Sequence, residues 1–464
     1  MKSQKQNLYE HFRRTQPEFT YKKFSCDLID NKLLVKYYFN IGEKYFFSPE
    51  HFLPLPPGFD EKKLKNSLFR NIIFNLGMVE AISYWKSACP PRMLIHAGTL
   101  HEEQLGFWKK LFLHGLGEFF YVNGIEPGDE PIHFVQNNGI AFQRSSLPND
   151  RSAGVLVPVG GGKDSVVTLE VLSRQHKCTP YIMNPREASM RSAKFAGYSE
   201  SDVLSSERSI DPALLDMNDQ GFLNGHTPFS ALLAFTAVLM AFLHGHAEIA
   251  LSNESSANEP SIPGTKINHQ YSKSLEFEND FREYLAKYIT GDINYYSFLR
   301  PLNELQIAGL FSMFPAHHES FRSCNVGSKT NSWCGNCPKC LFTFIVLSPF
   351  ISHKKLVSLF GKDLLNDGSL IPLLDKLTGN AAEKPFDCVG TIDEVNLAMR
   401  FLVSVYGNAD KLPVLLKYYR SQNMQLKTGL SQEFSAALAR FDEHNIPSQK
   451  DVNLLKSLLN DISY

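Results

Sequence analysis

The sequence lacks a hydrophobic segment long enough to cross a membrane. Its longest apolar stretch, Phe229 to Leu243, spans 15 residues, whereas a membrane-spanning helix needs about 20. The N-terminus is polar and lacks the apolar core of a secretory signal. We therefore predict a cytoplasmic chain with no membrane partner. We predict that the apolar stretch forms a buried helix over 228–243, with Thr227 as its cap and Pro228 in its first turn.

An excess of positive charge is also absent. Lys and Arg total 47 and Asp and Glu total 48, which leaves a net charge of −1. No dominant basic surface for tRNA or DNA is indicated, so the predicted partner is a small molecule and not a nucleic acid. Hydrophobic residues make up 43% of the 464 residues, which predicts a globular protein of two or three domains. The oligomeric state is left open.

Cysteine is scarce outside one short segment. Four of the eight cysteines occur in Cys324-x₉-Cys334-Gly-Asn-Cys337-Pro-Lys-Cys340. Two overlapping C-x₂-C spacings and one more distant cysteine fit a tetrahedral, structural Zn²⁺ site. A reducing compartment favours metal binding over disulfides. A redox or iron–sulfur site built on three of the thiols is the alternative.

A glycine-rich turn follows the apolar run at 153–159. The next residues are Gly160-Gly-Gly-Lys-Asp-Ser165, so we predict a strand, a tight turn and a helix from Ser165 onward. Backbone N–H groups in such a turn, together with the positive end of the helix, form a site for phosphate oxygens. An ordinary strand-to-helix turn without a ligand is the alternative.

The spacing around this turn excludes two common nucleotide motifs. A P-loop would need glycine in place of Val157 and a hydroxyl residue in place of Asp164. The dinucleotide fingerprint would need a third glycine in place of Ser165. The phosphate site predicted here therefore belongs to another class.

The pattern along the chain predicts an α/β protein of three domains. Residues 1–150 read as α+β, 151–345 as a parallel sheet covered by helices, and 346–464 as mostly helical. Pro148–Arg151 is the expected linker, and Thr391 with Glu394 forms a capping box for one C-terminal helix. The expected strands are 27–29, 33–39 and 44–47 in an antiparallel meander, then 132–135, 153–159, 179–183 and 248–251. The expected N-terminal helices are 61–86 and 101–121.

Polar loops follow the strands of the predicted parallel sheet, where ligands bind in such folds. Asn184 opens the loop after the second strand, and Glu254 and Glu259 lie in the loop after the third. With Asp164, these two glutamates are candidate ligands for Mg²⁺, which prefers oxygen. A solvated loop without a ligand is the alternative. His226 is equally compatible with a site residue and with a turn residue whose ring nitrogens have hydrogen-bond partners.

Several segments together carry a resemblance to known families. The Gly160–Ser165 loop resembles the pyrophosphatase loop of the N-type ATP pyrophosphatases, Ser-Gly-Gly-x-Asp-Ser, with Gly160 in place of its first serine. The cysteine segment is similar to one in the 7-cyano-7-deazaguanine synthases. The chain as a whole resembles the UDP-N-acetylmuramoyl-L-alanyl-L-glutamate epimerases. The segments that carry this narrower likeness, besides the loop and the cysteine segment, are 253–259, 269–273 and 385–391.

This resemblance implies a fold and a reaction. The fold is an α/β domain of the PP-loop ATP pyrophosphatase type, flanked by the α+β and helical regions. The reaction inverts the terminal L-glutamate of UDP-MurNAc-L-Ala-L-Glu, with ATP and Mg²⁺ as cofactors and AMP and pyrophosphate as products. The substrate is carried as an acyl-adenylate, and the pathway is peptidoglycan precursor synthesis.

The resemblance also implies roles for individual residues. The residues assigned to ATP are Gly160, Gly161, Gly162, Lys163, Asp164, Ser165 and Asn184. Lys163 neutralises pyrophosphate, and Asp164 faces Mg²⁺ or the phosphates. The candidate acid/base groups at the glutamate α-carbon are His269, Tyr271, Lys273 and Cys388. Cys388 reads alternatively as a small buried hydrophobe.

Two other functions stay open on the sequence. One is a different adenylating enzyme of the same superfamily, such as a deazaguanine nitrile synthase, an amide ligase or a tRNA-thiolating enzyme. The balanced charge disfavours thiolation, and Met1-Lys2 offers no N-terminal nucleophilic cysteine for glutamine-fed amidation. The other is a nucleotide-binding or zinc-dependent module without catalytic activity.

Overall fold

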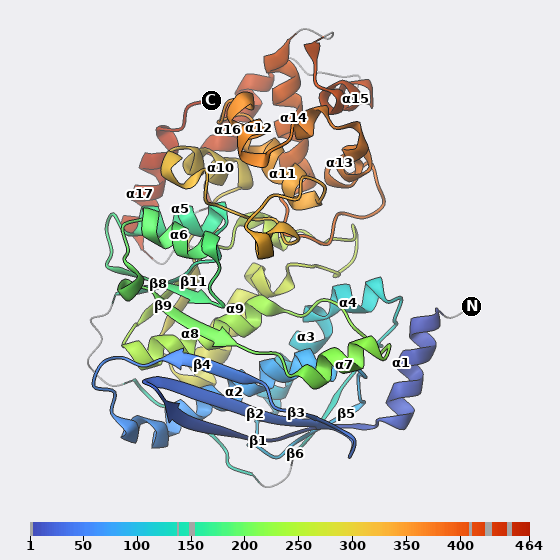
Figure 1. Ribbon diagram of the computed structural model, residues 1–464, viewed down its shortest axis with the longest axis vertical. Helices are drawn as coiled ribbons and strands as arrows, with labels where there is room; N and C mark the ends of the chain where they lie inside the picture. The colour runs from blue at the N-terminus through green and yellow to red at the C-terminus, as the bar shows by residue number, and fades with distance from the viewer. Residues whose placement is uncertain (1–2, 137–138, 148–153, 408–410, 423–428, 443–447) are drawn as a thin grey trace. The chain divides into compact units, whose positions relative to one another are not determined.

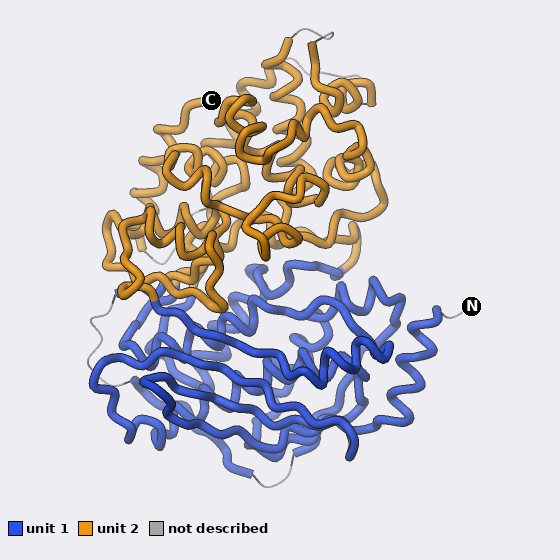
Figure 2. Tube along the Cα trace, in the orientation of Figure 1, with its two compact units in different colours: residues 1–156, 204–249, 266–295 blue, residues 157–203, 250–265, 296–464 orange. Residues whose placement is uncertain are grey.

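The computed structural model describes residues 3–136, 139–147, 154–407, 411–422, 429–442 and 448–464. The chain forms two compact units, each assembled from separate stretches (Figure 2). Unit 1 comprises Met1–Leu156, Leu204–Ile249 and Lys266–Tyr295, and unit 2 comprises Val157–Val203, Ala250–Thr265 and Tyr296–Tyr464. The expected linker at 148–151 lies outside the described residues. The division into three consecutive domains stays a prediction.

Unit 1 is built on a mixed sheet. Its strand order is β6-β5-β1-β2-β4-β9, and β3 pairs with the edge of β2. β1, β3 and β4 each pair with β2 in antiparallel fashion, whereas β5 is parallel to β1. The expected meander is therefore confirmed. The strands are β1 (Glu18–Ile29), β2 (Lys32–Ile41), β3 (Tyr45–Phe47), β4 (Glu50–Pro54), β5 (Arg92–Ile95), β6 (His133–Gln136) and β9 (Leu204–Arg208).

The first strand is much longer than its sequence pattern indicates. Phe19 and Tyr21 are fully buried, and the register of β1 against β2 then shifts between Tyr21 and Lys23. Such an irregularity inserts a residue and breaks the period of two. The alternation that defines a strand is therefore interrupted at Lys22 and Lys23, and only the end of the strand was predicted.

A long buried helix, α2 (Ser67–Trp85), packs against β1, β2 and α8 (Phe229–His244). Because it is covered on more than one side, most of its residues are buried and it lacks a polar face. The other helices of unit 1 are α1 (Gln4–Thr15), α3 (Glu102–Gly115), α4 (Gly117–Val122), α7 (Pro212–Asp219) and α9 (Leu275–Tyr284). The expected helix over 61–86 is divided, because Asn66 caps α2 after a short 3₁₀ turn at Glu61–Lys65.

The buried apolar helix is confirmed as α8, but its predicted cap is wrong. Pro228 has non-helical backbone angles and occupies the cap position, so the helix begins at Phe229 and not one residue earlier. Thr227 lies outside the helix. Within the residues that the structure describes, no helix is long and apolar enough to cross a membrane. The cytoplasmic location stays a prediction.

A buried ionic network ties α2 to two strands of unit 1. Glu80 is fully buried and receives two hydrogen bonds from Arg208, at 2.8 and 2.7 Å, while His51 Nε2 lies 3.0 Å from Glu80 Oε2. Burial by itself would raise the pKa of Glu80, but the charge of Arg208 and the two hydrogen-bonded partners lower it to about 2. Glu80 is therefore ionised and holds β4 and β9 on the helix.

The three predicted strands of the parallel sheet are confirmed as β7 (Val155–Pro158), β8 (Cys178–Met183) and β10 (Glu248–Leu251). A fourth strand, β11 (Asn294–Ser297), gives the order β11-β10-β7-β8, and β10 runs parallel to β7. The boundary between the units passes through β7, β10 and β11 themselves. The observed class is mixed α/β.

Unit 2 is mostly helical. Figure 1 shows its C-terminal helices gathered around α11 and α14, and Thr391 with Glu394 forms the predicted capping box of α14. The helices are α5 (Lys163–Leu172), α6 (Glu187–Phe195), α10 (Glu304–Ser312), α11 (Pro338–Leu347), α12 (His353–Phe360), α13 (Ile371–Thr378), α14 (Ile392–Tyr406), α15 (Val414–Gln422), α16 (Leu430–Ala439) and α17 (Gln449–Asn460). The prediction of a helical C-terminal region is confirmed.

Candidate functional site

The glycine turn joins β7 to α5, as predicted, and the helix begins two residues early, at Lys163. Gly161 has φ +87°, and a Cβ at this position would lie 2.7 Å from the Ser189 backbone nitrogen. Its carbonyl accepts a hydrogen bond of 2.8 Å from the Arg322 N–H. Glycine is thus required at position 161, because its φ is positive and because a Cβ atom would not fit there. Gly160 is exposed, and a Cβ there would meet no atom within 4 Å.

Lys163 is turned inward at the start of α5. Its side chain is 4% exposed, and its ammonium forms ion pairs with Asp164 and with Glu304. Burial opposes the charged form, but these two carboxylates raise the pKa of Lys163 above its usual value. Lys163 is therefore a buried, fully charged cation directly behind the turn.

Glu304 is a site residue that the sequence pattern did not single out. It is buried at the first position of α10, where Asn303 provides the cap, so in sequence it looks like an ordinary first-turn acid. Its burial raises the pKa of Glu304 well above its ordinary range against the pull of Lys163, and nearby Asp164, Glu254 and Glu394 raise it further. Four carboxylates therefore share this part of unit 2.

The Glu394 carboxylate is held by backbone N–H groups, and the backbone of Glu254 is held by an arginine side chain. Glu394 Oε1 accepts a 2.8 Å hydrogen bond from the Glu304 N–H, while its Oε2 accepts one of 2.6 Å from the Thr391 N–H. The backbone carbonyl of Glu254, a buried residue, accepts a 2.6 Å hydrogen bond from Arg300 Nη1. The capping box predicted from sequence thus also orients the start of α10.

The remaining predicted residues of unit 2 lie in three places. Glu259 pairs with Lys384, which also donates a 3.0 Å hydrogen bond to the Gly390 carbonyl. This links the Glu259 loop to the loop that holds Cys388, a half-buried thiol. Asn184 is exposed directly after β8, with φ +52°. Asp164 and Glu254 are thus close enough to Glu304 to raise its pKa, whereas Glu259 pairs with Lys384 of a neighbouring loop.

The four clustered cysteines converge in unit 2. Their sulfur atoms all lie within 4.8 Å of one another. Cys324 and Cys334 lie 3.7 Å from Cys337 and Cys340 respectively, and Cys337 and Cys340 are 3.4 Å apart. A tetrahedral site with Zn–S bonds of about 2.3 Å requires sulfur separations of about 3.8 Å. The donor set and its spacing therefore fit Zn²⁺.

Unit 1 holds the other predicted acid/base residues. His269 and His226 both face Glu118, and their ring centroids are 4.6 Å apart. Tyr271 and Lys273 belong to a short 3₁₀ turn at Tyr271–Lys273. Burial, followed by the charges of Asp280 and Glu276, raises the pKa of the Tyr271 hydroxyl, which makes it a poor base at neutral pH. The histidines are better suited to proton transfer.

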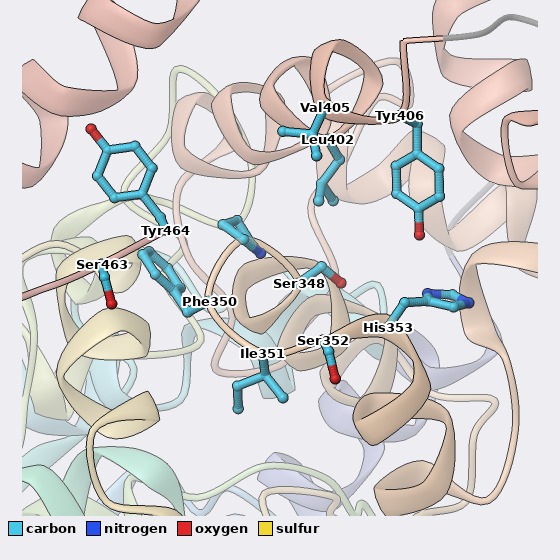
Figure 3. A pocket seen from close by; sticks show the side chains of 11 residues that line it. Ser348, Phe350, Ile351, Ser352, His353, Leu402, Val405, Tyr406, Ser463 and Tyr464 are labelled. Carbon is cyan, nitrogen blue, oxygen red and sulfur yellow. The ribbon is translucent and has the colours of Figure 1, made fainter.

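Unit 2 also has an open hollow of about 570 Å³ near the chain's C-terminus (Figure 3). It is lined by residues between α11 and α12, by α14 and by Tyr464, and the rings of His353 and Tyr406 border it. None of the residues predicted from sequence to form a site lines this hollow.

Two models of one protein family match successive parts of this chain. The family model described as the MurL N-terminal domain matches residues 11–298, and that of the MurL C-terminal domain matches residues 320–431. The chain belongs to the MurL family. The first MurL match contains the glycine turn and the Glu118–His226–His269 cluster. The second contains the four cysteines and Glu394.

Curated MurL-family relatives cover most of the chain. A protein of Xanthomonas oryzae pv. oryzae, named UDP-N-acetyl-alpha-D-muramoyl-L-alanyl-L-glutamate epimerase, is 36% identical over 339 residues, 71% of this chain and 74% of that protein. A protein of the same name from Micromonospora sp. is 34% identical over 398 residues, 84% of this chain and 87% of that protein. A Salinispora tropica protein, again of the same name, is 33% identical over 84% of this chain and 85% of its own length. No solved structure matches the chain.

Proposed function

We propose that this chain inverts the terminal L-glutamate of UDP-MurNAc-L-Ala-L-Glu to D-glutamate in an ATP-dependent reaction that releases AMP and pyrophosphate. Support comes from the relatives, which match most of this chain and are named as this epimerase. The observation that carries ATP use is the turn at 160–162, which places Lys163 and Asp164 at the start of α5. It also supports an assignment of this part of unit 2 to the PP-loop ATP pyrophosphatases.

Adenylation solves the chemical problem of the reaction. The α-carbon next to an ionised carboxylate is a very weak acid, because the negative charge opposes a second negative charge beside it. Transfer of AMP to the carboxylate removes that charge and yields an activated ester. A side chain of ordinary basicity can then take the α-proton. Reprotonation on the opposite face and hydrolysis of the ester complete the inversion.

The residues of unit 2 divide the work of binding ATP. The N–H groups of the turn and of Ser165 would hold phosphate oxygens, and Lys163 would neutralise pyrophosphate as it forms. Asn184 would contact the nucleotide at the end of β8. Asp164 and Glu254 would hold Mg²⁺, which screens the phosphate charge, whereas Glu259 is already paired with Lys384. Because Lys163 is already balanced by two carboxylates, it is held as a cation before ATP arrives.

The cysteine cluster would hold a structural Zn²⁺. Cys337 caps α11 and Cys340 lies in its first turn, whereas Cys324 and Cys334 come from the preceding loop. Four thiolates leave no open position for a substrate, so the metal would fix the loop on the helix and take no part in the reaction.

The decisive experiment incubates the purified protein with UDP-MurNAc-L-Ala-L-Glu, ATP and Mg²⁺. We expect D-glutamate after hydrolysis of the peptide, with AMP and pyrophosphate as products. The Lys163→Ala variant should form no AMP, whereas Lys355→Ala, which removes an exposed cation of α12, should behave as the parent. Formation of ADP, or AMP without inversion, would show a different enzyme. A binding module would give no ATP–pyrophosphate exchange with any carboxylate offered.

A further inference from the structure

The third glycine of the turn in unit 2 is not required by its own backbone angles. Gly162 has φ −90° and ψ 171°, an extended conformation that any residue adopts. A Cβ at this position would instead lie 2.9 Å from the hydroxyl oxygen of Ser323. Carbon and oxygen atoms that are not bonded do not normally pack so closely. Glycine at position 162 therefore leaves space for one particular side chain, that of Ser323.

The backbone on both sides of Ser323 is fixed. On one side, the Arg322 N–H donates a 2.8 Å hydrogen bond to the Gly161 carbonyl in the turn. On the other side, Cys324 is buried in the cysteine cluster, where its sulfur accepts a 3.1 Å hydrogen bond from the Gly327 N–H. Because both neighbours are held, Ser323 stays beside the turn, and its hydroxyl can move only by rotation of its side chain.

Of three serines that lie at the turn, two have hydroxyl groups that are already hydrogen-bonded. The Ser165 hydroxyl donates to the Gly162 carbonyl at 3.1 Å, and the Ser189 hydroxyl donates to the Arg186 carbonyl at 2.9 Å. The hydroxyl of the half-buried Ser323 has no hydrogen-bond partner among the residues that the structure describes. A polar group that is partly shielded from water and has no protein partner is available to a ligand.

The surroundings of this hydroxyl select an anionic ligand. Gly162, which has no side chain, occupies the cap position of α5, so it offers no side-chain acceptor to the first N–H groups of the helix. Lys163 adds a positive charge directly behind the turn. A hydroxyl hydrogen can turn towards an acceptor, and its hydrogen bond to a charged oxygen is stronger than one to a neutral oxygen. A phosphate oxygen meets these requirements.

We propose that Ser323 is a phosphate-binding residue of the ATP site, with its hydroxyl donating a hydrogen bond to a phosphate oxygen at the glycine turn, and that Gly162 keeps the space which this hydroxyl occupies. This proposal rests on the proposed function and adds a residue to its nucleotide site. The three glycines of the turn carry no side chain, so a second segment of unit 2 supplies the hydroxyl. Ser323 holds ATP before any bond is broken, and its loss therefore raises KM for ATP and leaves kcat unchanged.

The test titrates ATP with Mg²⁺ into the full-length protein in a calorimeter, without the peptide substrate. Ser323→Ala should bind ATP about 10- to 100-fold more weakly, the usual effect of losing one hydrogen bond to a charged group. Ser323→Thr keeps the hydroxyl and should recover most of the affinity. The control is Ser332→Ala, which removes an exposed hydroxyl of the same loop, 2.9 Å from that of Thr330. It should bind ATP with the parental affinity.

The role of Gly162 is tested by combining substitutions. Gly162→Ala should weaken ATP binding, because the added Cβ displaces the Ser323 hydroxyl from the turn. In the double variant Gly162→Ala, Ser323→Ala, this Cβ enters the space that the hydroxyl has left. The double variant should therefore bind ATP no more weakly than Ser323→Ala alone. If the two losses of affinity multiply, Gly162 does not act through Ser323 and this part of the proposal is wrong.

Two results would overturn the role of Ser323: parental affinity for ATP in Ser323→Ala, or weaker binding that is accompanied by a lower thermal unfolding midpoint and is not recovered in Ser323→Thr. The second result would show that the side chain only supports the loop. Failure of the proposed function is distinguished by the parental protein. If the parent binds ATP but forms no D-glutamate, the proposed function fails and the result for Ser323 stands. If the parent binds no ATP, both fail.

Discussion

Removal of the Lys163 ammonium should destabilise unit 2 in a way that depends on pH. In Lys163→Met, Glu304 stays buried near Asp164, Glu254 and Glu394 without the cation that pairs with it. Breaking a buried ion pair from one side typically costs about 3–5 kcal/mol. Glu304 can escape part of this cost by taking up a proton, because its pKa in the folded chain already lies well above that of an ordinary glutamate.

The protonation route sets an upper bound on the cost. The pKa of such a carboxyl is higher in the folded chain than the value of about 4.5 in the unfolded chain. The buried carboxyl is therefore tolerated below pH 4.5, where it is protonated in both states. Its contribution to the free energy of unfolding is lost as the pH rises from 4.5 towards the folded-state pKa. Each pH unit above 4.5 is worth about 1.4 kcal/mol, so an unpaired Glu304 can cost at most about 5 kcal/mol at pH 8 and about 2 kcal/mol at pH 6. The deficit of Lys163→Met should therefore shrink at acid pH.

Urea unfolding at pH 6 and pH 8 measures this deficit, with Trp333 as a fluorescent reporter in unit 2. The double variant Lys163→Met, Glu304→Gln is the matched control, because it removes the buried charge together with its partner. It should recover most of the lost stability at pH 8. If the single and double variants are equally unstable, or if the deficit is the same at both pH values, Lys163 does not balance Glu304 and the reasoning is wrong.

Three further predictions concern the turn, the cysteines and the ionic network of unit 1. Gly161→Ala should cost about 1–3 kcal/mol and suppress AMP formation, because its φ is positive and its Cβ position is occupied; Gly160→Ser, where the Cβ position is open, should keep parental stability in the same assays. The purified protein should contain one Zn²⁺ per chain by elemental analysis and Cys337→Ser none, and equal zinc in both would contradict the site. Glu80→Gln should destabilise unit 1 by about 3–5 kcal/mol at pH 7, because Arg208 loses a buried partner. Glu80 has a pKa of about 2 in the folded chain, so its contribution is present above pH 4.5 and is lost as the pH falls towards 2; a difference between parent and variant that grows below pH 4.5 would contradict this.

Local patterns predicted the elements whose residues interact with near neighbours in sequence. The glycine turn, the strands β7, β8 and β10, the helix α8 and the capping box of Thr391 and Glu394 all follow from periodicity and spacing. The errors lie where the period is broken or where one residue decides a boundary. β1 contains a register shift, and α8 begins after Pro228, which takes the cap position expected of Thr227.

The composition of the candidate sites could be predicted only in part. The four cysteines were found because their spacing is itself the signal of a metal site. Glu304 was missed because an acid in the first turn of a helix has an ordinary explanation in the helix dipole. Glu118 was missed for a similar reason, since nothing near it in sequence suggests that it faces His226 and His269.

The sequence by itself determined the glycine turn, the cluster of four cysteines and the family, because each depends on residue types at fixed short spacings. Only the tertiary structure decided which charges meet. Lys163 and Glu304 are 141 positions apart, and Glu118 and His269 are 151 apart. An ion pair or a shared proton depends on distance in space and on exclusion of water, and neither quantity is encoded in the local order of residues.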